Sequence, residues 1–132
     1  MFLTLETDYA IRIVEYLAQS SKKTDARTIA QKTGVTQRYA LKILRKLVLG
    51  GIVKSYKGAK GGYLLASEPA EISLLDVVLI FNNGLEFSSC QLCGVCSHPT
   101  GMCRFNNVFN RASENIRELF KNTKFNIKED VE

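Results

Sequence analysis

All four cysteines of this 132-residue chain lie between positions 90 and 103. They follow the pattern Cys90-x2-Cys93-x2-Cys96-x6-Cys103. Thiolates this close in sequence can converge on one metal centre, and soft sulfur ligands select zinc or iron–sulfur clusters over hard cations. A zinc site usually presents two separate Cys-x2-Cys pairs, whereas this segment has one overlapping set and a separate fourth cysteine. The pattern therefore favours an iron–sulfur cluster, 2Fe-2S or 4Fe-4S, with a zinc site as the alternative.

Two other functions use clustered cysteines, electron transfer and thiol oxidoreduction, and the rest of the sequence argues against both. Arg104 stands where bacterial ferredoxins have the proline that follows their fourth cysteine. His98 could bind a metal, although a solvated loop histidine is the simpler interpretation. A ferredoxin-like electron carrier would use the cluster but would have no use for the basic half of the chain. A thiol oxidoreductase would use a Cys-x2-Cys pair, but no βαβ pattern surrounds this one and no residue is placed to act as its base.

Positive charge is concentrated in the first half of the chain. Residues 1–60 hold 12 basic and 4 acidic residues, a net charge of +8, while residues 61–132 hold 6 basic and 9 acidic residues, a net charge of −3. A polyanion such as double-stranded DNA would therefore meet the first half. We find neither a signal-peptide pattern nor a run of about 18 apolar residues, so we expect a cytoplasmic protein without a membrane span. Thiols stay reduced in that compartment, which favours metal ligands over disulfides.

Three helices are predicted in the basic half, from apolar residues at helical spacing and from capping residues. Their expected bounds are residues 8–20 after an N-cap at Thr7, Ala26–Lys32 between Asp25 and Gly34, and a third helix from residues 35–38 to Gly50-Gly51. Two helices joined by a tight glycine turn are typical of a helix-turn-helix motif.

A β-hairpin is predicted directly after these helices. Residues 52–56 and 63–66 are short runs rich in branched and aromatic residues, separated by the basic, glycine-rich segment 57–62. Such a hairpin after a helix-turn-helix is a wing. Ser73 and Asp76 then form a capping-box signature for a further helix.

The expected fold class is therefore mostly α with a small β-hairpin: a winged helix-turn-helix plus a long C-terminal dimerisation helix. The expected divisions are a DNA-binding domain over 1–83, a cysteine-rich loop over 84–102, a dimerisation helix over 103–124 and a tail over 125–132. The loop lacks an apolar pattern and needs a metal to organise it. The long helix repeats apolar residues such as Ile116, Leu119 and Phe120 at three- and four-residue steps, which indicates pairing with a second copy, with folding back on its own domain as the alternative.

The start of the third helix is expected to read DNA in the major groove. Arg38 is the best candidate for a base contact, because a bidentate arginine–guanine pair discriminates by about 1–3 kcal/mol, and Gln37 could read adenine. At the wing, glycines permit close backbone approach and lysines bring positive charge. The simpler alternative is that these are ordinary exposed residues. The predicted DNA-binding residues are Thr36, Gln37, Arg38, Lys42, Lys57, Lys60 and Gly61.

Taken together, these segments resemble the Rrf family of transcription regulators, whose members include IscR-, NsrR- and CymR-like proteins. The resemblance covers about residues 1–120. The segments that carry it are residues 1–4 with Asp8-Tyr9-Ala10, Ile29-Ala30 with Gly34-Val35, the wing from Gly58 to Leu65, and the cysteine loop. It implies a homodimeric winged-helix repressor or activator, and no enzyme, that dimerises through the long last helix.

The resemblance also implies a cluster held by three loop cysteines, and Cys90, Cys96 and Cys103 match them by position. In NsrR-like members an Asp near the start of the first helix of the other subunit completes the site, and Asp8 matches that residue. In IscR-like members the fourth ligand is a His, but Asn106 stands at that position here. The fourth ligand is therefore either Cys93 or Asp8, and the choice stays open.

Overall fold

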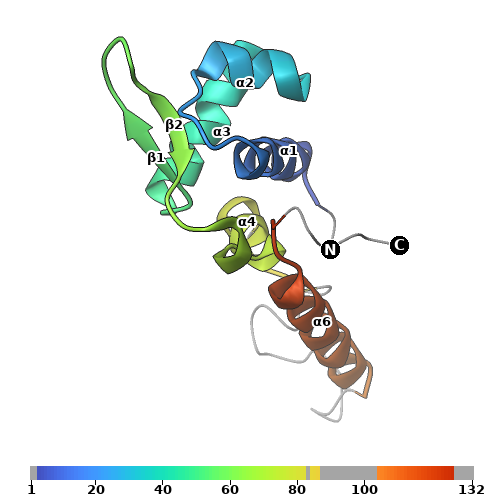
Figure 1. Ribbon diagram of the computed structural model, residues 1–132. Coiled ribbons are helices and arrows are strands. Elements are labelled where there is room, and N and C mark those ends of the chain that lie inside the picture. The colour runs from blue at the N-terminus through green and yellow to red at the C-terminus, as the bar shows by residue number, and fades with distance from the viewer. Residues whose placement is uncertain (1–2, 83, 87–103, 127–132) are drawn as a thin grey trace.

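The computed structural model describes residues 3–82, 84–86 and 104–126, and it confirms the mostly helical fold with a small hairpin (Figure 1). The elements are α1 (Leu5–Gln19), α2 (Ala26–Thr33), α3 (Gln37–Leu49), β1 (Val53–Tyr56), β2 (Gly62–Leu65), the 3-10 turn η1 (Pro69–Glu71), α4 (Leu74–Phe81) and α6 (Arg104–Asn122). The order of the first three helices and the hairpin is that of a winged helix-turn-helix.

Helix α1 begins one turn earlier than the sequence pattern predicts. The expected helix started after an N-cap at Thr7, but the N-cap is Thr4, whose hydroxyl oxygen accepts a hydrogen bond from the Thr7 amide at 3.1 Å. Thr7 lies inside the first turn, fully buried, and its own hydroxyl donates to Asn82 Oδ1 at 2.7 Å. The prediction was wrong because two threonines three residues apart can each cap, and the tertiary contact with Asn82 decided between them.

The core lies where α1, α2 and α3 meet the base of the hairpin. Each of the three helices buries one apolar face, and Val53 of β1 with Ile72 and Val77 extends this core toward α4. The largest fully buried side chains on the helices are Ile13, Val14, Leu17, Ile29, Ile43, Leu44 and Leu47. The helical periodicity predicted most of these positions, because each helix has to bury one stripe of side chains against its neighbours.

The hairpin is joined by one bridge residue, Thr24, that the sequence pattern did not indicate. Strands β1 and β2 pair antiparallel, with Val53 opposite Leu65 and Tyr56 opposite Gly62. Thr24, in the connection between α1 and α2, pairs with Tyr63 through two backbone hydrogen bonds of 3.1 and 2.8 Å. This pairing ties the base of the wing to the loop that precedes α2.

Gly62 permits that pairing, and its replacement gives a first prediction. Its φ is +141°, and a Cβ atom there would lie 2.9 Å from the Thr24 carbonyl. We expect Gly62→Ala to lower the free energy of unfolding by about 1–3 kcal/mol, because both the backbone conformation and the close contact become strained. The measurement is the midpoint of urea unfolding. Gly58→Ala is the control: its φ is +98° but nothing lies within 4 Å of the added atom, so an equal loss in both variants would show that the Thr24 contact contributes nothing.

Helix α4 begins at the predicted capping box. The Asp76 amide donates to Ser73 Oγ at 3.1 Å, and the Ser73 amide donates to Asp76 Oδ2 at 2.9 Å. These two reciprocal bonds satisfy backbone donors that the first turn of any helix leaves free. The helix then carries its apolar side chains to both α1 and α6.

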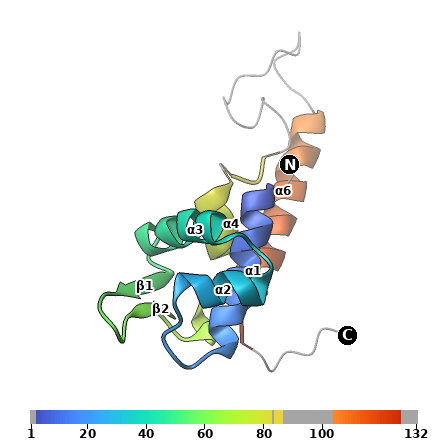
Figure 2. The ribbon, with the colours of Figure 1, turned by 90° about the horizontal axis from the view of Figure 1, so that it is seen from above.

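Helix α6 packs on α4 through its C-terminal half only, and its N-terminal half extends away from the winged domain (Figures 1 and 2). Ile116 and Phe120 pack against a small second core made by Leu75, Val78 and Leu85. After the helix, the Phe125 amide donates to the carbonyls of Pro69 and Ile72 at 3.2 Å each, and Phe125 packs against the main core. The described start of the predicted tail is therefore attached to the fold; residues 127–132 lie outside the described residues.

Candidate nucleic-acid interface

Helices α2 and α3 are held together by capping residues at both sides of their turn. Asp25 caps α2 by accepting from the Thr28 amide at 3.0 Å, and hydrogen bonds from Thr28 lower the pKa of Asp25. Helix α2 ends at Gly34, which takes the left-handed conformation, and Val35 is buried in the turn. Thr36 caps α3 by accepting from the Tyr39 amide at 3.3 Å. The N-terminus of α3 is thereby fixed relative to α2, as a recognition helix requires.

The residues predicted to read DNA lie exposed on α3. Gln37, Arg38 and Lys42 are exposed, as are Thr36 at the cap and Arg45 one turn further on. The opposite face of the helix is buried, because Ala40, Ile43, Leu44 and Leu47 face the core. The structure therefore brings these polar and basic side chains together on the outer part of one helix.

Glu6 of α1 contacts two lysines of α3, and the sequence pattern did not predict this contact. Its carboxylate lies 2.8 Å from Lys46 Nζ and 3.7 Å from Lys42 Nζ, and only 18% of its side chain is exposed. Lys42 is therefore held near a partly buried negative charge from α1. No local pattern could have indicated the contact, because it joins residues 40 positions apart that meet only in the folded chain.

Aromatic contacts also join the start of α1 to α3. The rings of Tyr9 and Tyr39 meet edge to face, with centroids 5.3 Å apart. Lys42 Nζ lies 5.7 Å from the Tyr39 ring centroid, and the Arg12 guanidinium lies 5.3 Å from that of Tyr9. Aromatic pairs of this geometry contribute about 0.5–1.5 kcal/mol beyond their buried area. The recognition helix is thus anchored to α1 by both charge and aromatic contacts.

The wing presents the two predicted lysines at its tip. Lys57 and Lys60 are exposed, and the turn between them closes when the Gly61 amide donates to the Gly58 carbonyl at 2.9 Å. A Cβ atom on Gly61 would overlap the Tyr56 carbonyl oxygen. The hairpin turn itself therefore requires glycine at position 61, and contact of Gly61 with DNA stays a prediction.

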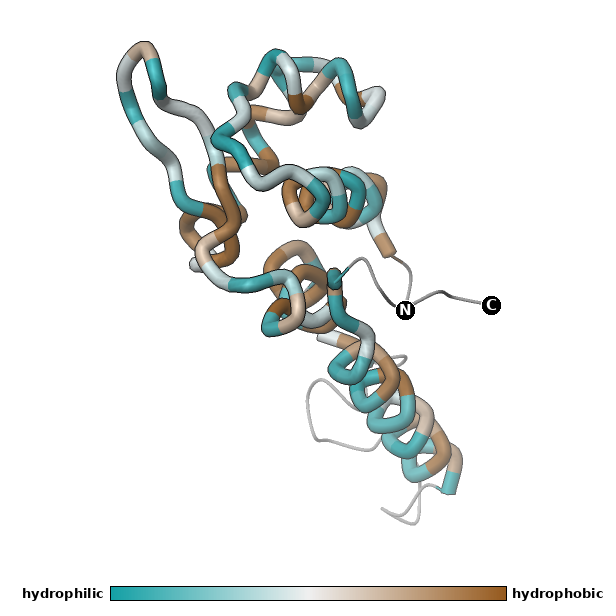
Figure 3. The backbone as a smooth tube through the Cα atoms, viewed as in Figure 1, coloured by the Kyte–Doolittle hydropathy of each residue, from teal (hydrophilic) through white to brown (hydrophobic). Residues whose placement is uncertain are grey.

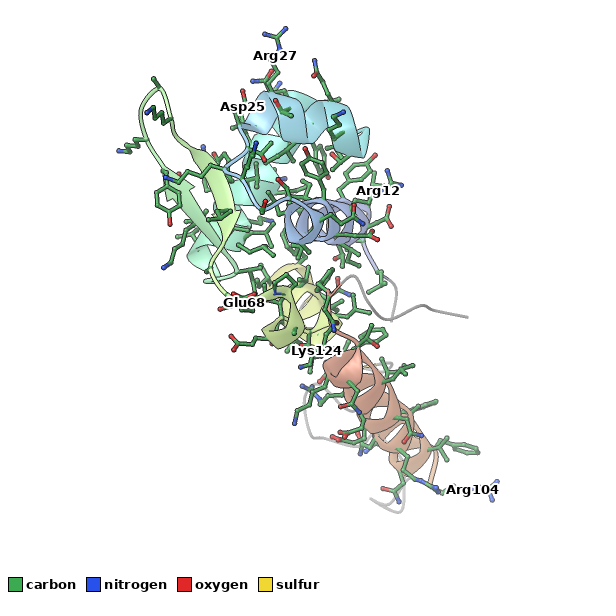
Figure 4. All side chains as sticks on the ribbon, viewed as in Figure 1. Arg12, Asp25, Arg27, Glu68, Arg104 and Lys124 are labelled. Atoms are coloured by element: carbon green, nitrogen blue, oxygen red, sulfur yellow. The ribbon has the colours of Figure 1, made fainter. Side chains whose placement is uncertain are left out.

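Lys23 is a further basic residue beside the wing that the sequence reasoning did not select. Its Nζ lies 4.1 Å from the centre of the Tyr56 ring, a cation–π contact between the α1–α2 connection and the end of β1. Arg27 extends into solvent from α2 (Figure 4). Both are among the 12 basic residues that give residues 1–60 their net charge of +8.

Asp8 is the one predicted metal ligand among the described residues; all four cysteines and His98 lie outside them. The Asp8 side chain is 53% exposed, and its Oδ2 lies 3.0 Å from the Arg12 guanidinium. The described ranges contain no group of three or more His, Cys, Asp or Glu side chains that could hold a metal. Asp8 is accessible to a second chain, but a metal there would have to compete with Arg12.

An apolar face remains exposed along α6. One side of this helix is apolar over its length while the other is polar (Figure 3). Its exposed large apolar side chains are Phe105 (55%), Val108 (57%), Phe109 (38%) and Leu119 (64%). Four such residues on one side of a helix form a patch of the kind that marks a protein interface. The described helices include none with the length and apolar character of a membrane span.

Comparisons with known sequences agree with this geometry. A family model described as "Rrf2: Iron-dependent Transcriptional regulator" matches residues 3–127. Protein aau3 of Rhizobium meliloti is 32% identical over 123 residues, which cover 92% of this chain and 80% of that protein. The HTH-type transcriptional regulator NsrR of Halalkalibacterium halodurans is 31% identical over 110 residues, which cover 82% of this chain and 72% of that protein.

Solved structures share the fold. CymR, the global cysteine regulator of B. subtilis, superposes with a TM-score of 0.78 at 23% identity, over 95% of this chain and 93% of that one. IscR of T. potens superposes with a TM-score of 0.75 at 23% identity, over 95% of this chain and 83% of that one. At this level of identity the likeness shows a common fold.

Proposed function

This chain belongs to the Rrf2 family of transcriptional regulators, and we propose that it binds operator DNA as a homodimer whose affinity is controlled by an iron–sulfur cluster on residues 90–103. DNA binding is supported above all by the exposed basic surface of α3, which lies beside a wing with lysines at its tip. The test is binding of a fluorescent operator duplex by anaerobically reconstituted protein, before and after the cluster is removed.

In this proposal α3 enters the major groove and the wing lies against the neighbouring backbone. Arg38 pairs with guanine and Gln37 with adenine, while Thr36 and Lys42 hold phosphates and fix the register. Lys57 and Lys60 bring charge to the backbone or the minor groove, and Gly61 lets the wing approach closely. The Glu6 carboxylate limits where Lys42 can reach, because it holds the amine at 3.7 Å.

The residues present fit an iron–sulfur cluster by their chemistry. Cys90, Cys96 and Cys103 supply three thiolates, and either Cys93 or Asp8 supplies the fourth ligand. Asp8 is exposed on α1 and would reach the loop of the second subunit in a dimer. The iron-dependent description of the family supports iron at this site. When bound, the cluster supplies a redox-sensitive centre and the bonds that order a loop without an apolar pattern.

Control of DNA affinity would follow from the place of this loop in the chain. The loop leads directly into α6, the proposed dimerisation helix, and α6 packs on α4 and thereby on the winged domain. Ordering of the loop would therefore change how the two recognition helices are spaced across the two-fold axis, and half-site spacing determines operator affinity.

A zinc-stabilised regulator is the second candidate, because the same four thiols suit zinc. The two candidates differ in colour and in regulation. A cluster gives a brown protein whose operator affinity changes when the chromophore is lost, whereas a zinc site gives a colourless protein whose loop senses nothing. Anaerobic purification with iron, sulfide and zinc analysis separates them.

A second prediction separates base readout from backbone attraction on the proposed DNA surface. We expect Arg38→Ala to relax sequence preference at one base step in each half-site, with a loss of about 1–3 kcal/mol per half-site on the operator and little loss on random DNA. Lys60→Ala should weaken binding to all sequences alike and lower the salt slope by about one unit for each half-site bound. The measurement is a titration of both duplexes at several salt concentrations. Equal losses of Arg38→Ala on operator and random DNA would contradict the assignment of Arg38 to a base.

A further inference from the structure

An apolar side chain interrupts the basic surface of the recognition helix. Leu41 lies in α3 and is 41% exposed, and it belongs to neither of the two core clusters. Side chains three and four positions apart are neighbours on a helix, so Leu41 lies between Arg38 and Arg45, with Lys42 next to it in sequence. The chain thus places a leucine, without a partner in the core, among exposed cations.

Exposure of a single leucine is ordinary and by itself argues for no partner. The residues around Leu41 are charged. Three flanking cations make the local surface complementary to a polyanion and unfavourable for an apolar protein surface, because a buried charge without a partner is costly. The major groove of DNA has all the properties that such a partner needs. Its phosphates attract these cations, it is wide enough for an α-helix, and its base edges present an apolar group.

We propose that Leu41 contacts the 5-methyl group of a thymine in the major groove and makes an A·T pair at that step a determinant of operator preference. This inference rests on the proposed function, in which α3 docks in that groove. The thymine methyl is the one apolar group that the major-groove edges present. A G·C pair at the same step would instead leave base acceptors or donors against a side chain that cannot hydrogen-bond, so leucine both favours thymine and disfavours guanine.

The experiment deletes the methyl group from the DNA and the side chain from the protein. An operator is first selected from random duplexes with the wild-type dimer, and each thymine is then replaced singly by deoxyuridine, which lacks only the methyl. We expect one thymine in each half-site at which the wild type loses about four-fold in affinity, the effect of burying one methyl group. Leu41→Ala changes both subunits, so it should bind the unmodified operator about 16-fold more weakly, about four-fold for each half-site, and lose little more when that same methyl is removed.

Leu49→Ala is the matched control, because Leu49 is 83% exposed at the other end of α3. This variant should keep the full wild-type response to deoxyuridine. The proposal is overturned if Leu41→Ala and the wild type respond equally at every thymine, or if Leu41→Ala weakens binding to all duplexes alike, which would place the leucine against the sugar–phosphate backbone. It is also overturned if Leu41→Ala changes the oligomeric state in sedimentation. Failure of the wild type to select any operator would instead contradict the proposed function, so the two failures are distinguishable.

Discussion

Replacement of Cys90, Cys96 or Cys103 by alanine is expected to abolish the iron–sulfur chromophore of the anaerobically reconstituted protein. Each replacement removes one of the three thiolates that both proposed ligand sets share, and the sequence of this segment has no apolar pattern, so the remaining ligands cannot keep the centre in place. The measurement is the ultraviolet–visible spectrum together with iron and sulfide content per chain. We expect each variant to lose the cluster-dependent change in operator affinity as well, while Arg38 and the wing still bind DNA.

The fourth ligand can be identified by the same measurement. If Cys93 is the ligand, Asp8→Asn keeps a normal spectrum and Cys93→Ala does not; if Asp8 is the ligand, the results are reversed. Asp8 also forms the 3.0 Å ion pair with Arg12, so Asp8→Asn changes the surface of α1 whether or not it touches a metal. Arg12→Ala is the control, since it removes the same ion pair and leaves every candidate ligand in place. A spectrum that changes equally in Asp8→Asn and Arg12→Ala would remove Asp8 from the ligand set.

One result would contradict the sensing proposal as a whole. If the reconstituted wild type binds only colourless zinc, and its operator affinity does not change when the metal is removed, the cysteine loop has a structural role alone. The assignment of the chain to a family of transcriptional regulators would still hold, because it rests on residues 3–127 and on the winged-helix fold.

The parts of the fold that could be predicted are those that short segments encode by themselves. Ser73 and Asp76 satisfy each other's backbone amides within one turn, and Asp25 and Gly34 mark both ends of α2. The exposed positions of Arg38 and Lys42 followed from the buried stripe on the opposite side of α3. Such features depend on neighbours within a few residues, so the sequence pattern determines them.

The contacts that could not be predicted join distant residues. Glu6 is an ordinary surface carboxylate by sequence, yet it lies between Lys42 and Lys46 because α1 crosses α3 at that point. Lys23 reaches the Tyr56 ring because Gly62, opposite Tyr56, carries no side chain and lets the Thr24 backbone approach. The long helix folds back on its own domain in part: Ile116 packs on that domain, while Leu119 stays exposed.

Leu119 is a better residue than Ile116 with which to test dimerisation. Ile116 is partly buried against α4, so a charge at this position would damage the fold of a single chain as well as any interface. Leu119 is 64% exposed and lies on the free apolar face together with Val108, Phe105 and Phe109. In a two-fold symmetric dimer, residues of this face would be buried in both subunits at once.

We expect Leu119→Glu to convert the dimer into monomers, because two carboxylates would be buried without partners in an apolar contact between equivalent helices. Operator affinity should fall by a factor of about 10²–10⁴, since each half-site would then be bound without the gain from a linked second site. Sedimentation velocity measures the first effect and operator titration the second. Asn107→Glu, an exposed position on the polar side of the same helix, adds the same charge and should leave both unchanged. A wild type that sediments as a monomer at micromolar concentration, or a Leu119→Glu variant that remains dimeric, would show that the apolar face of α6 contacts something other than a second copy of this chain.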